Sequence, residues 1–573
     1  VFVVLGALVQ GFLVNGHVNA IISTIEKRFD LSSTESGLIA SCYDIGACVA
    51  ILSVTYIGAH GHKPLWVGWG VFLIGVSGIL FSLPHFTAPM YTYTLTNNTC
   101  GASEIAECSV NSARSHRYAI WFFYLAFIIA GFGGAPLYSL GITYMDENLS
   151  HLITTNSPLT IPGILVTGSI IGPGIGFLVG GAFLGVYTYP EEQVAILDSN
   201  EAWVGAWWMG ALIVGCIGVL SSLPILMLPR TLPGTHHHRQ NRGQDIGSVK
   251  TTSIPGYKPC SLYQGVVGVV SLLITNHHRV YRYRDFPKCV LVLLRNPVFV
   301  LVSIAGAVDS ILISGLATFG AKYIETIFGL SATDAGIAFG ALALVGAAGG
   351  QLLGGGLITK FNIRMTWILR MTYMAPVVTW FLSAGFIISC SDILFAGVST
   401  QYHDASPSGG SFVSTCNLNC GCDLNVYKPV CGADGITYYS ACFAGCSAVG
   451  TAGNTYENCT CVSATTGVAT NISSATTGVC SGSGCGAGGM FALFCILMFL
   501  FMVFTFLNEA SALQASLRCV AFNQRSFAIG VQWLIIRLIG TIPGPLIIGA
   551  VFDRNCAQWS LNCGEKGSCS TYN

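Results

Sequence analysis

Long apolar windows separated by shorter polar stretches run along almost the whole chain. Because a helix that spans a bilayer needs about 20 mainly apolar residues, each window is a candidate span. Eleven windows qualify, at 1–24, 37–58, 65–84, 118–142, 162–187, 203–228, 297–318, 335–357, 367–390, 490–508 and 527–551. The pattern predicts an all-α membrane protein. The chain ends at Asn573 in a polar segment, where a twelfth span is expected to follow and is missing.

Composition supports a membrane protein and argues against several other classes. Apolar residues make up 52% of the chain and charged residues only 9%, against about 25% charged in an ordinary soluble protein. The net charge is zero, so no basic field points to nucleic acid. No paired-carboxylate, P-loop or nucleophile-elbow pattern supports an enzyme, and no cofactor is expected. The run His236 to His238 lacks a carboxylate or cysteine at ligand spacing, so we expect a solvated loop there and no metal site.

The basic residues of the loops predict the orientation. With a cytoplasmic N-terminus, the cytoplasmic loops hold sixteen Lys and Arg residues and the opposite loops eight, as the positive-inside rule requires. Ten of the sixteen lie in the loop 229–296. The same orientation places the glycosylation sequons at Asn97, Asn458 and Asn471 outside the cell. We therefore expect a multi-pass protein of the plasma membrane.

The windows divide the chain into two halves. We expect an N-terminal six-helix bundle at 1–228, a cytoplasmic linker at 229–296, a C-terminal bundle at 297–390 and 490–573, and an extracellular insert at 391–489 with its core at 416–461. Gly172-Pro173 in the fifth window has an echo in Pro543-Gly544-Pro545 of the eleventh. Matching features in the two halves are typical of a parallel repeat with the substrate site between them. Glycines that serve packing alone would give the same pattern.

The insert concentrates cysteines in a polar stretch, which is typical of disulfides in an oxidising compartment. Its ten cysteines are Cys416, Cys420, Cys422, Cys431, Cys442, Cys446, Cys459, Cys461, Cys480 and Cys485. They are sufficient for five bridges, which a module too small for a large core needs for stability. Zinc is the competing interpretation of such a cluster, and the extracellular side argues against it. The spacing from Cys416 to Cys446, with the segment Cys431–Cys442, resembles the Kazal domain.

A Kazal-like insert between the ninth and tenth windows resembles one family in particular, the organic anion transporting polypeptides of the major facilitator superfamily. Four further segments are similar to that family: Trp203 to Gly210 (WVGAWWMG), Ser82 to Phe86 (SLPHF), Tyr43 to Gly46 (YDIG) and Gly61 to Pro64 (GHKP). A fifth, Arg537 to Pro545 (RLIGTIPGP), is also similar. Together with Gly61 to Pro64, it is most similar to the fourth subfamily.

The resemblance implies two six-helix bundles that rock about a central site. It also implies sodium-independent transport of large amphipathic organic anions, such as steroid conjugates, bile salts, prostaglandins or thyroid hormones. Exchange against an anion such as bicarbonate is the expected driving force. Two positions depart from the family signature, which carries Asp and Arg where this chain has Asn200 and Ala202. This difference puts the gating of the outer mouth, or the substrate range, in doubt.

Two basic residues inside spans are the first candidates for substrate binding, because a charge in a span is costly and usually functional. Arg537 lies about a third of the way into the eleventh window and is expected to hold a carboxylate or sulfate with two parallel hydrogen bonds. The alternative is an ion pair with Asp44 or Asp309. Lys322 continues a stripe with Ser314 and Thr318 at helical spacing. This stripe either lines an aqueous path, or its hydroxyls bond back to their own helix while the lysine reaches the headgroups.

The remaining candidates are polar or aromatic. Asn15, His17 and Asn19 in the first window are expected to bond substrate or to tie helices together. The family resemblance ties the position of His85 to pH-sensitive uptake, and a structural role at the helix end is the alternative. Asp44 and the tryptophans are further candidates for gating or pH sensing. Trp203, Trp207 and Trp208 are also expected to form an interfacial belt.

Two other classes of protein remain as alternatives. A membrane-anchored Kazal-type protease inhibitor or cell-surface receptor would use the insert and not the spans. A channel would need a ring of selectivity residues, and the sequence shows no such ring.

Overall fold

The computed structural model describes most of the helical part of the chain and much of the insert. The described residues are 1–58, 61–91, 99–101, 117–141, 144–145, 161–192, 203–230, 290–291, 293–361, 365–387, 394–397, 400–402, 412–422, 428–450, 455–463, 473–478, 480, 489–518, 520, 525–562 and 565–572.

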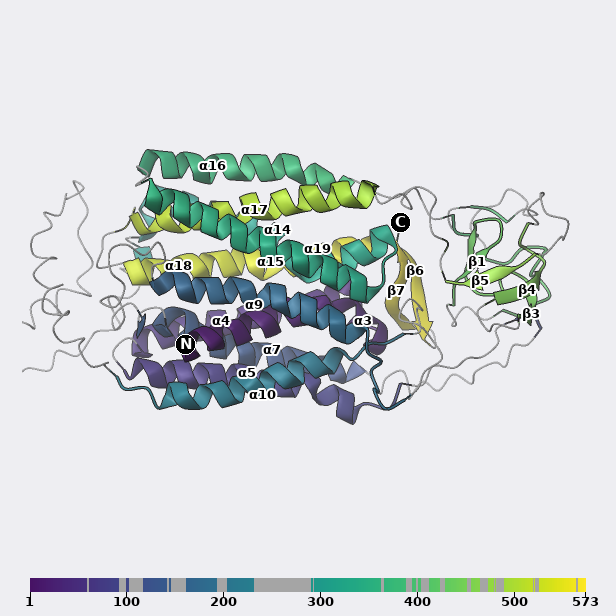
Figure 1. The fold of residues 1–573 in the computed structure, drawn as a ribbon, viewed down its shortest axis with the longest axis horizontal. Coiled ribbons are helices and arrows are strands. Elements are labelled where there is room, and N and C mark those ends of the chain that lie inside the picture. The colour runs from purple at the N-terminus through teal and green to yellow at the C-terminus, as the bar shows by residue number, and fades with distance from the viewer. Residues whose placement is uncertain are drawn as a thin grey trace, which may run out of the picture.

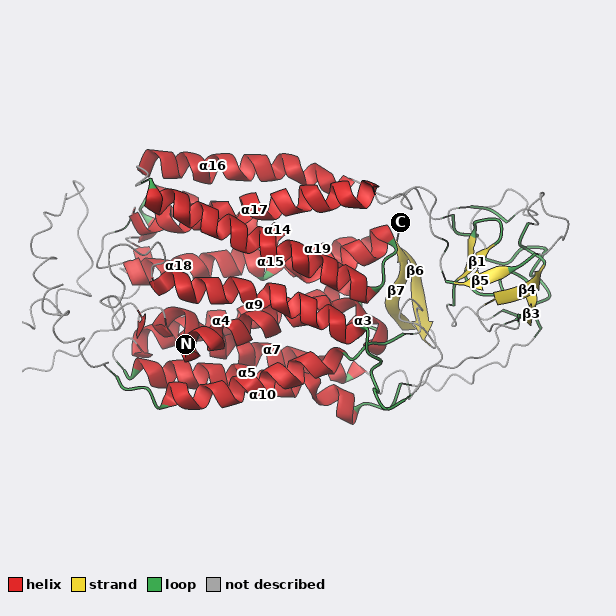
Figure 2. Ribbon diagram, viewed as in Figure 1, coloured by secondary structure: helices red, strands yellow, loops and turns green. Residues whose placement is uncertain are grey.

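Parallel and antiparallel helices packed side by side form the main body, and a small β-rich unit lies at one end of it (Figures 1 and 2). The helices of the first half are α1 (Phe2–Gln10), η1 (Gly11–His17), α2 (Val18–Ala20), α3 (Ile22–Phe29), α4 (Ser33–Gly58), α5 (Lys63–Thr87), α7 (Ala119–Pro136), η2 (Leu137–Gly141), α9 (Ile161–Leu184) and α10 (Trp207–Leu226). Those of the second half are α14 (Pro297–Phe328), α15 (Ala332–Lys360), α16 (Met365–Leu382), η4 (Ser383–Ile387), α17 (Gly489–Arg518), α18 (Arg525–Ile536), η6 (Arg537–Thr541) and α19 (Pro543–Arg554).

The helices occupy the apolar windows of the sequence. Within the described residues, eight of them are long and apolar enough to cross a membrane, among them Lys63–Thr87 and Gly489–Leu513. Large apolar side chains such as Trp121, Leu301 and Trp380 lie exposed on the outer surface of the helices. A soluble protein would hide such side chains, so this surface is suited to lipid.

Glycines bring the helices of the first half close together. A Cβ added at Gly16 in η1 would lie only 2.4 Å from the carbonyl oxygen of Pro173 in α9, and one at Gly46 in α4 would lie 2.3 Å from that of Ile128 in α7. Backbones at this separation leave no room for any side chain other than hydrogen, as is typical of helix packing in membranes.

The two halves meet along two helix pairs. α4 packs on α19, and α9 packs on α15. Counted along the chain, these are the second and eleventh helical spans and the fifth and eighth. A parallel repeat relates the second span to the eighth and the fifth span to the eleventh. It therefore superimposes the α4–α19 pair on the α15–α9 pair. The contacts between the halves thus have the symmetry that the sequence echo predicts.

The insert is held by disulfides and a small antiparallel sheet. Its strands are β1 (Val430–Gly432), β2 (Thr437–Tyr438), β3 (Cys446–Val449), β4 (Thr455–Cys459) and β5 (Ala475–Thr477), in the order β2-β1-β5-β4-β3. Four bridges lie within it, Cys416–Cys461, Cys422–Cys442, Cys431–Cys480 and Cys446–Cys459. Near the helical body, β6 (Cys556–Asn562) and β7 (Glu565–Tyr572) form a hairpin closed by Cys556–Cys569.

One cysteine of the insert pairs outside it, which corrects the expectation of five internal bridges. Cys420 is bonded to Cys100, in the connection between α5 and α7. Backbone hydrogen bonds flank this bridge, from Cys100 N to the carbonyl of Cys446 at 2.8 Å and from Gly101 N to that of Cys420 at 3.2 Å. The first half is therefore covalently joined to the insert. Cys485 lies outside the described residues.

Candidate functional site between the two halves

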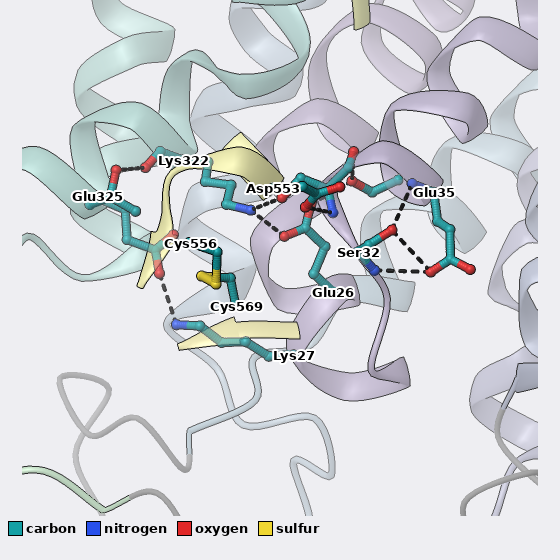
Figure 3. A network of polar contacts seen from close by, with 12 residues as sticks. Glu26, Lys27, Ser32, Glu35, Lys322, Glu325, Asp553, Cys556 and Cys569 are labelled. Atoms are coloured by element: carbon teal, nitrogen blue, oxygen red, sulfur yellow. Dashed lines mark hydrogen bonds and ion pairs between the residues drawn. A yellow bond between two sulfur atoms is a disulfide. The ribbon is translucent and has the colours of Figure 1, made fainter. Parts of the chain in front are cut away.

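The insert end of the helical body, where α3, α19 and the β6–β7 hairpin lie next to the insert (Figure 1), joins the halves through buried polar contacts. Lys322 of α14 forms an ion pair with Glu26 of α3, and each side chain is only 4% exposed. The ammonium group also donates to Ser33 Oγ at 2.8 Å, and the Ser36 hydroxyl donates to Glu26. A second ion pair, Lys27 to Glu325, joins the same helices at 2.9 Å. Figure 3 shows these pairs together.

Aromatic rings complete the surroundings of Lys322. Its Nζ lies 5.1 Å from the ring centre of Phe552 and 5.2 Å from that of Tyr572. Cations are attracted to ring faces at this range. Lys322 therefore does not extend to the headgroups, and its partners come from α3, α4, α19 and β7.

The start of α4 is capped from both halves. Within the first half, Ser32 and Glu35 form a capping box, in which Ser32 N donates to Glu35 Oε2 at 3.0 Å and Glu35 N donates to Ser32 Oγ at 3.2 Å. From the second half, Asp553 at the end of α19 accepts the backbone N–H groups of Ser33 and Thr34, each at 2.9 Å. These donors have no partner within their own helix, so Asp553 serves as a cap only while the two halves are together.

Deeper in the body, Arg537 pairs with Asp44 of α4, and their side chains are 11% and 16% exposed. The sequence predicts Asp44 and Asp309 as alternative ion-pair partners of Arg537. In the structure the partner is Asp44. The guanidinium carbon lies 5.6 Å from the ring centre of Tyr43 and 5.8 Å from that of Trp533. Among the described atoms, the Nε–H group of Arg537 is buried without a hydrogen-bond partner. One donor of the cation thus remains available after the ion pair has formed.

Local helix geometry explains the placement of Arg537. It opens η6, a π-helical turn in which Ile542 N bonds to the carbonyl of Arg537 at 3.0 Å. Pro543 and Pro545 follow directly and lack an N–H group, so the regular α-helical bonding cannot continue through them. Wide turns of this kind are rare and are frequently found at functional sites. The Arg537–Pro545 motif therefore combines a charge with a wide helical turn.

The hydroxyl stripe of α14 is satisfied within its own helix. Ser314 donates to the carbonyl of Ser310 at 2.7 Å, and Thr318 donates to that of Ser314 at 2.9 Å. This is the back-bonding alternative for these residues. Thr318 is also buried.

The three polar residues of the first helix differ in their surroundings. His17 is fully buried, with Nε2 at 3.0 Å from the Trp207 carbonyl, a contact that joins two helices of the same half. Asn19 is buried and donates to the carbonyl of Asn15 at 3.1 Å. Only Asn15 is exposed. The arrangement favours the interpretation that His17 ties two helices together, whereas Asn19 bonds back to its own helix.

The tryptophans lie further inside the protein than an interfacial belt. Trp207 is 1% exposed and packs edge-on against Phe29, Phe81 and Phe123, so the belt expected for it is wrong. Two half-buried neighbours bond to backbone, Trp203 to the Leu184 carbonyl at 2.8 Å and Trp208 to that of Thr188 at 3.1 Å.

His85 at the end of α5 stacks on Trp208, with ring centres 4.2 Å apart. The centre of the Tyr189 ring, in the connection between α9 and α10, lies 5.3 Å from the centre of the His85 ring. The histidine therefore belongs to an aromatic cluster, and its pH-sensing role stays a prediction.

Several residues of the site were not singled out in the sequence. Glu26, Lys27, Glu325 and Asp553 lie just outside the windows or at their ends. The one local signal was the Ser32-x-x-Glu35 pattern, which marks a helix start. Among the sequons, Asn458 is exposed on β4. Asn97, Asn471, Asn200, Ala202 and the histidines 236–238 lie outside the described residues.

The fold is shared with known transporters. The structure is similar to two solved structures of a bacterial homolog of the human lysosomal transporter Spinster, in inward-facing occupied and unoccupied conformations. The TM-scores are 0.50 and 0.51 at 14% and 15% identity, covering 97% and 96% of this chain and 82% of each of those chains. With the repeat symmetry described above, this likeness shows that the chain shares the helical fold of that bacterial transporter.

Sequence comparison names the family. The whole chain, residues 1–573, matches the Organic Anion Transporter Polypeptide family. It is 38% identical to solute carrier organic anion transporter family member 4A1 of Mus musculus, over 100% of this chain and 77% of that protein. It is 35% identical to member 4C1 of Rattus norvegicus, over 99% and 76%. The chain belongs to the Organic Anion Transporter Polypeptide family and is a transporter, not an enzyme; its resemblance to the fourth subfamily is confirmed.

Proposed function

We propose that this protein carries large amphipathic organic anions, such as steroid conjugates, bile salts, prostaglandins and thyroid hormones, across the plasma membrane without sodium. The N-terminus is cytoplasmic, and the two halves rock about a central site by alternating access. Exchange against an anion such as bicarbonate drives the cycle.

The observation that carries the proposal is Arg537, a cation deep in a span with one donor already on Asp44 and another without a partner. A carboxylate or sulfate on the substrate is an acceptor of the kind that this Nε–H group lacks. Because Asp44 belongs to the other half, a bound anion competes for the same cation and weakens a contact between the halves. Binding and rocking are thereby coupled.

The contacts at the insert end support alternating access. Lys322, Glu26 and Asp553 hold the halves together through charges that would be left without partners on separation. Such contacts form and break as units, which is what a gate between two conformations requires. These contacts are formed in this structure, which in the proposed cycle corresponds to a closed insert end.

The test is uptake of radiolabelled estrone sulfate by the purified protein in liposomes. Arg537→Ala should lower uptake by about ten- to a hundredfold, because a hydrogen bond to a charged group contributes about 1.5–3 kcal/mol. Arg537→Lys keeps the charge without the planar fork and should recover part of the uptake. Arg554→Ala is the matched control, since Arg554 is exposed at the end of the same helical span. Equal uptake per inserted molecule in wild type and Arg537→Ala would refute the anion-site assignment.

A further inference from the structure

Asn15 is an exposed side chain inside the most buried of the described spans. The first span, Phe2–Ala20, has a larger buried share than any of the other candidate spans, and its helices pack on α5, α9, α10 and α14. Within η1 and α2, every residue except Asn15 is buried. An exposed side chain on a span that is covered by protein opens onto the space between the two halves and not onto lipid.

The local packing of η1 leaves the Asn15 side chain free. Gly11 and Gly16 press against Pro173 of α9, where an added Cβ would lie 2.9 Å from the proline Cδ and 2.4 Å from its carbonyl oxygen. His17 contacts the Trp207 carbonyl of α10. Among the described hydrogen bonds, Asn15 takes part with its backbone carbonyl and not with its side chain. The wide turn thus presents one amide that has neither a packing role nor a partner within the protein.

An orphaned acceptor follows one turn nearer the insert end. Asn19 is 4% exposed, and its Oδ1 is buried with no hydrogen-bond partner among the described atoms. Its Nδ2 donates to the carbonyl of Asn15 at 3.1 Å. A buried amide oxygen without a donor is costly, and such groups require an explanation. The polar face of the first span therefore continues from Asn15 toward the closed end.

The second half carries the same stripe at equivalent positions. The segments 31–35 (LSSTE) and 330–334 (LSATD) lie 299 positions apart, and each begins a helix. Glu35 N donates to Ser32 Oγ at 3.2 Å, and Asp334 N donates to Ser331 Oγ at 3.1 Å. The same shift of 299 positions takes Asn15 to Ser314. The hydroxyl stripe of α14 is thus the repeat equivalent of the amide stripe of the first span.

Both stripes change from accessible to buried at the same level. Asn15 is exposed, and its equivalent Ser314 is half-buried. One turn nearer the insert end, Asn19 and its equivalent Thr318 are both buried. Because α14 packs on η1 and α2, the two stripes belong to one seam between the halves. Asn15 lies where the part of this seam that water reaches comes to its end.

The depth of Asn15 relative to Arg537 sets a length. A Cβ at Gly544 would lie only 2.1 Å from Ser314 Oγ, so these two residues are at the same level. Arg537 precedes Gly544 by seven positions, which is roughly 10 Å along the span at 1.5 Å per residue. A parallel repeat keeps depth in the membrane, so Asn15 shares the level of Ser314. A ligand that reaches from Arg537 to Asn15 is therefore at least about 10 Å long.

We propose that Asn15 forms a second substrate contact, in which its side-chain amide binds a neutral oxygen group at the end of the organic anion remote from the anionic group. An amide carries both donors and an acceptor, so it bonds a ketone or a hydroxyl group equally well. Arg537 holds the anionic group at the other end. Two polar contacts at opposite ends fix the orientation of a ligand in a mostly apolar site.

This inference rests on the proposed anion transport and narrows its substrates. The molecules favoured are rigid and elongated, with an anionic group at one end and a neutral oxygen at the other, as in a steroid sulfate with a keto group on its far ring. Anions too short to span the two levels bind at Arg537 alone and gain nothing from Asn15.

The test compares estrone sulfate with its deoxy analogue, which lacks the keto oxygen, in uptake by the full-length protein in liposomes. Wild type should show a KM about two- to tenfold lower for estrone sulfate, the effect of one neutral hydrogen bond. Asn15→Ala should raise the KM for estrone sulfate to that of the analogue and leave the analogue's KM unchanged. Thr87→Ala, which changes an exposed hydroxyl bonded within its own helix, should change neither value. Equal KM values for the two probes in wild type, or an equal rise of both in Asn15→Ala, would refute the contact.

A second measurement does not depend on transport. The Asn15→Cys variant should be alkylated by a water-soluble maleimide, detected by mass spectrometry of its peptides, and estrone sulfate should slow this reaction more than the deoxy analogue does. Absence of alkylation would show that this position is closed to water and would refute the contact, while uptake by wild type would leave anion transport standing. If wild type moves neither probe, anion transport is refuted, and equal protection by the two probes would then refute the contact as well.

Discussion

At the scale of single residues, the contacts that matter join positions far apart in the sequence. Lys322 and Glu26 are separated by 296 positions and Arg537 and Asp44 by 493. Both ion pairs are largely removed from water, so each charge depends on its partner for compensation. The stability of the protein is thus most sensitive to substitutions that remove one partner of such a pair and leave the other charge buried without compensation.

The Lys322–Glu26 pair gives a prediction about stability. Lys322→Met leaves the Glu26 carboxylate buried without its partner and should destabilise the protein by about 3–5 kcal/mol. The double change Lys322→Met with Glu26→Leu removes both charges and should restore most of the loss. Thermal unfolding of the purified proteins in detergent measures both effects. A double variant no more stable than Lys322→Met would contradict the view that the unpaired charge is what destabilises.

At the scale of helices, α4 and α19 approach each other through glycines. A Cβ at Gly549 would lie 2.4 Å from the carbonyl oxygen of Ser33, and one at Gly37 would lie 2.6 Å from that of Pro545. The opposing atoms are backbone, which cannot rotate away as a side chain can. The closed contact between the halves therefore depends on the absence of two side chains.

Gly37→Ala and Gly549→Ala should each keep the halves from closing at the insert end and reduce estrone sulfate uptake several-fold at normal surface expression. Gly349→Ala is the matched control, because a Cβ at that helical position meets nothing within 4 Å. Alanine there should keep uptake and favour the helix by up to about 1 kcal/mol. Uptake per molecule at the cell surface is the measurement. An equal loss of uptake in all three variants would contradict the prediction, because it would show a general effect of alanine and not a specific effect on closure.

Sequence patterns were sufficient for the helices but only for part of the site. Apolar windows of span length locate helices because burial in lipid imposes that length and composition. Arg537 stood out as a charge inside a window. The partners Glu26 and Asp553 could not be assigned, since only the packing of helices brings them to Lys322 and to the start of α4.

At the scale of the whole molecule, the Cys100–Cys420 bridge connects the first half to an insert carried by the second. Among the described residues, the non-covalent contacts between the halves include packed helix faces, the ion pairs of the insert end and the Arg537–Asp44 pair. The bridge is a link that persists when those contacts open. It predicts that the first half and the insert stay covalently joined throughout the transport cycle, also when the gate at the insert end is open.

A protease site introduced into the linker 229–296 tests this connection. After cleavage, the two halves of the wild type should migrate together on a denaturing gel without reductant and separate when reduced. Cys100→Ser should lower the joined fraction, and Cys216→Ser, which changes an exposed free cysteine, should not. Separation of the unreduced wild-type halves would show that the bridge is absent from the protein.

The same bridge has a consequence for biosynthesis. Cys420 leaves the ribosome 320 residues after Cys100, so the earlier thiol has to wait in the oxidising lumen until the later spans have been inserted. A chain in which the helices between Cys100 and Cys420 fail to enter the membrane cannot present Cys420 on the correct side and keeps an unoxidised thiol. Retention systems that detect free thiols would hold such chains back, so the crosslink also reports that the spans before the insert have been inserted correctly.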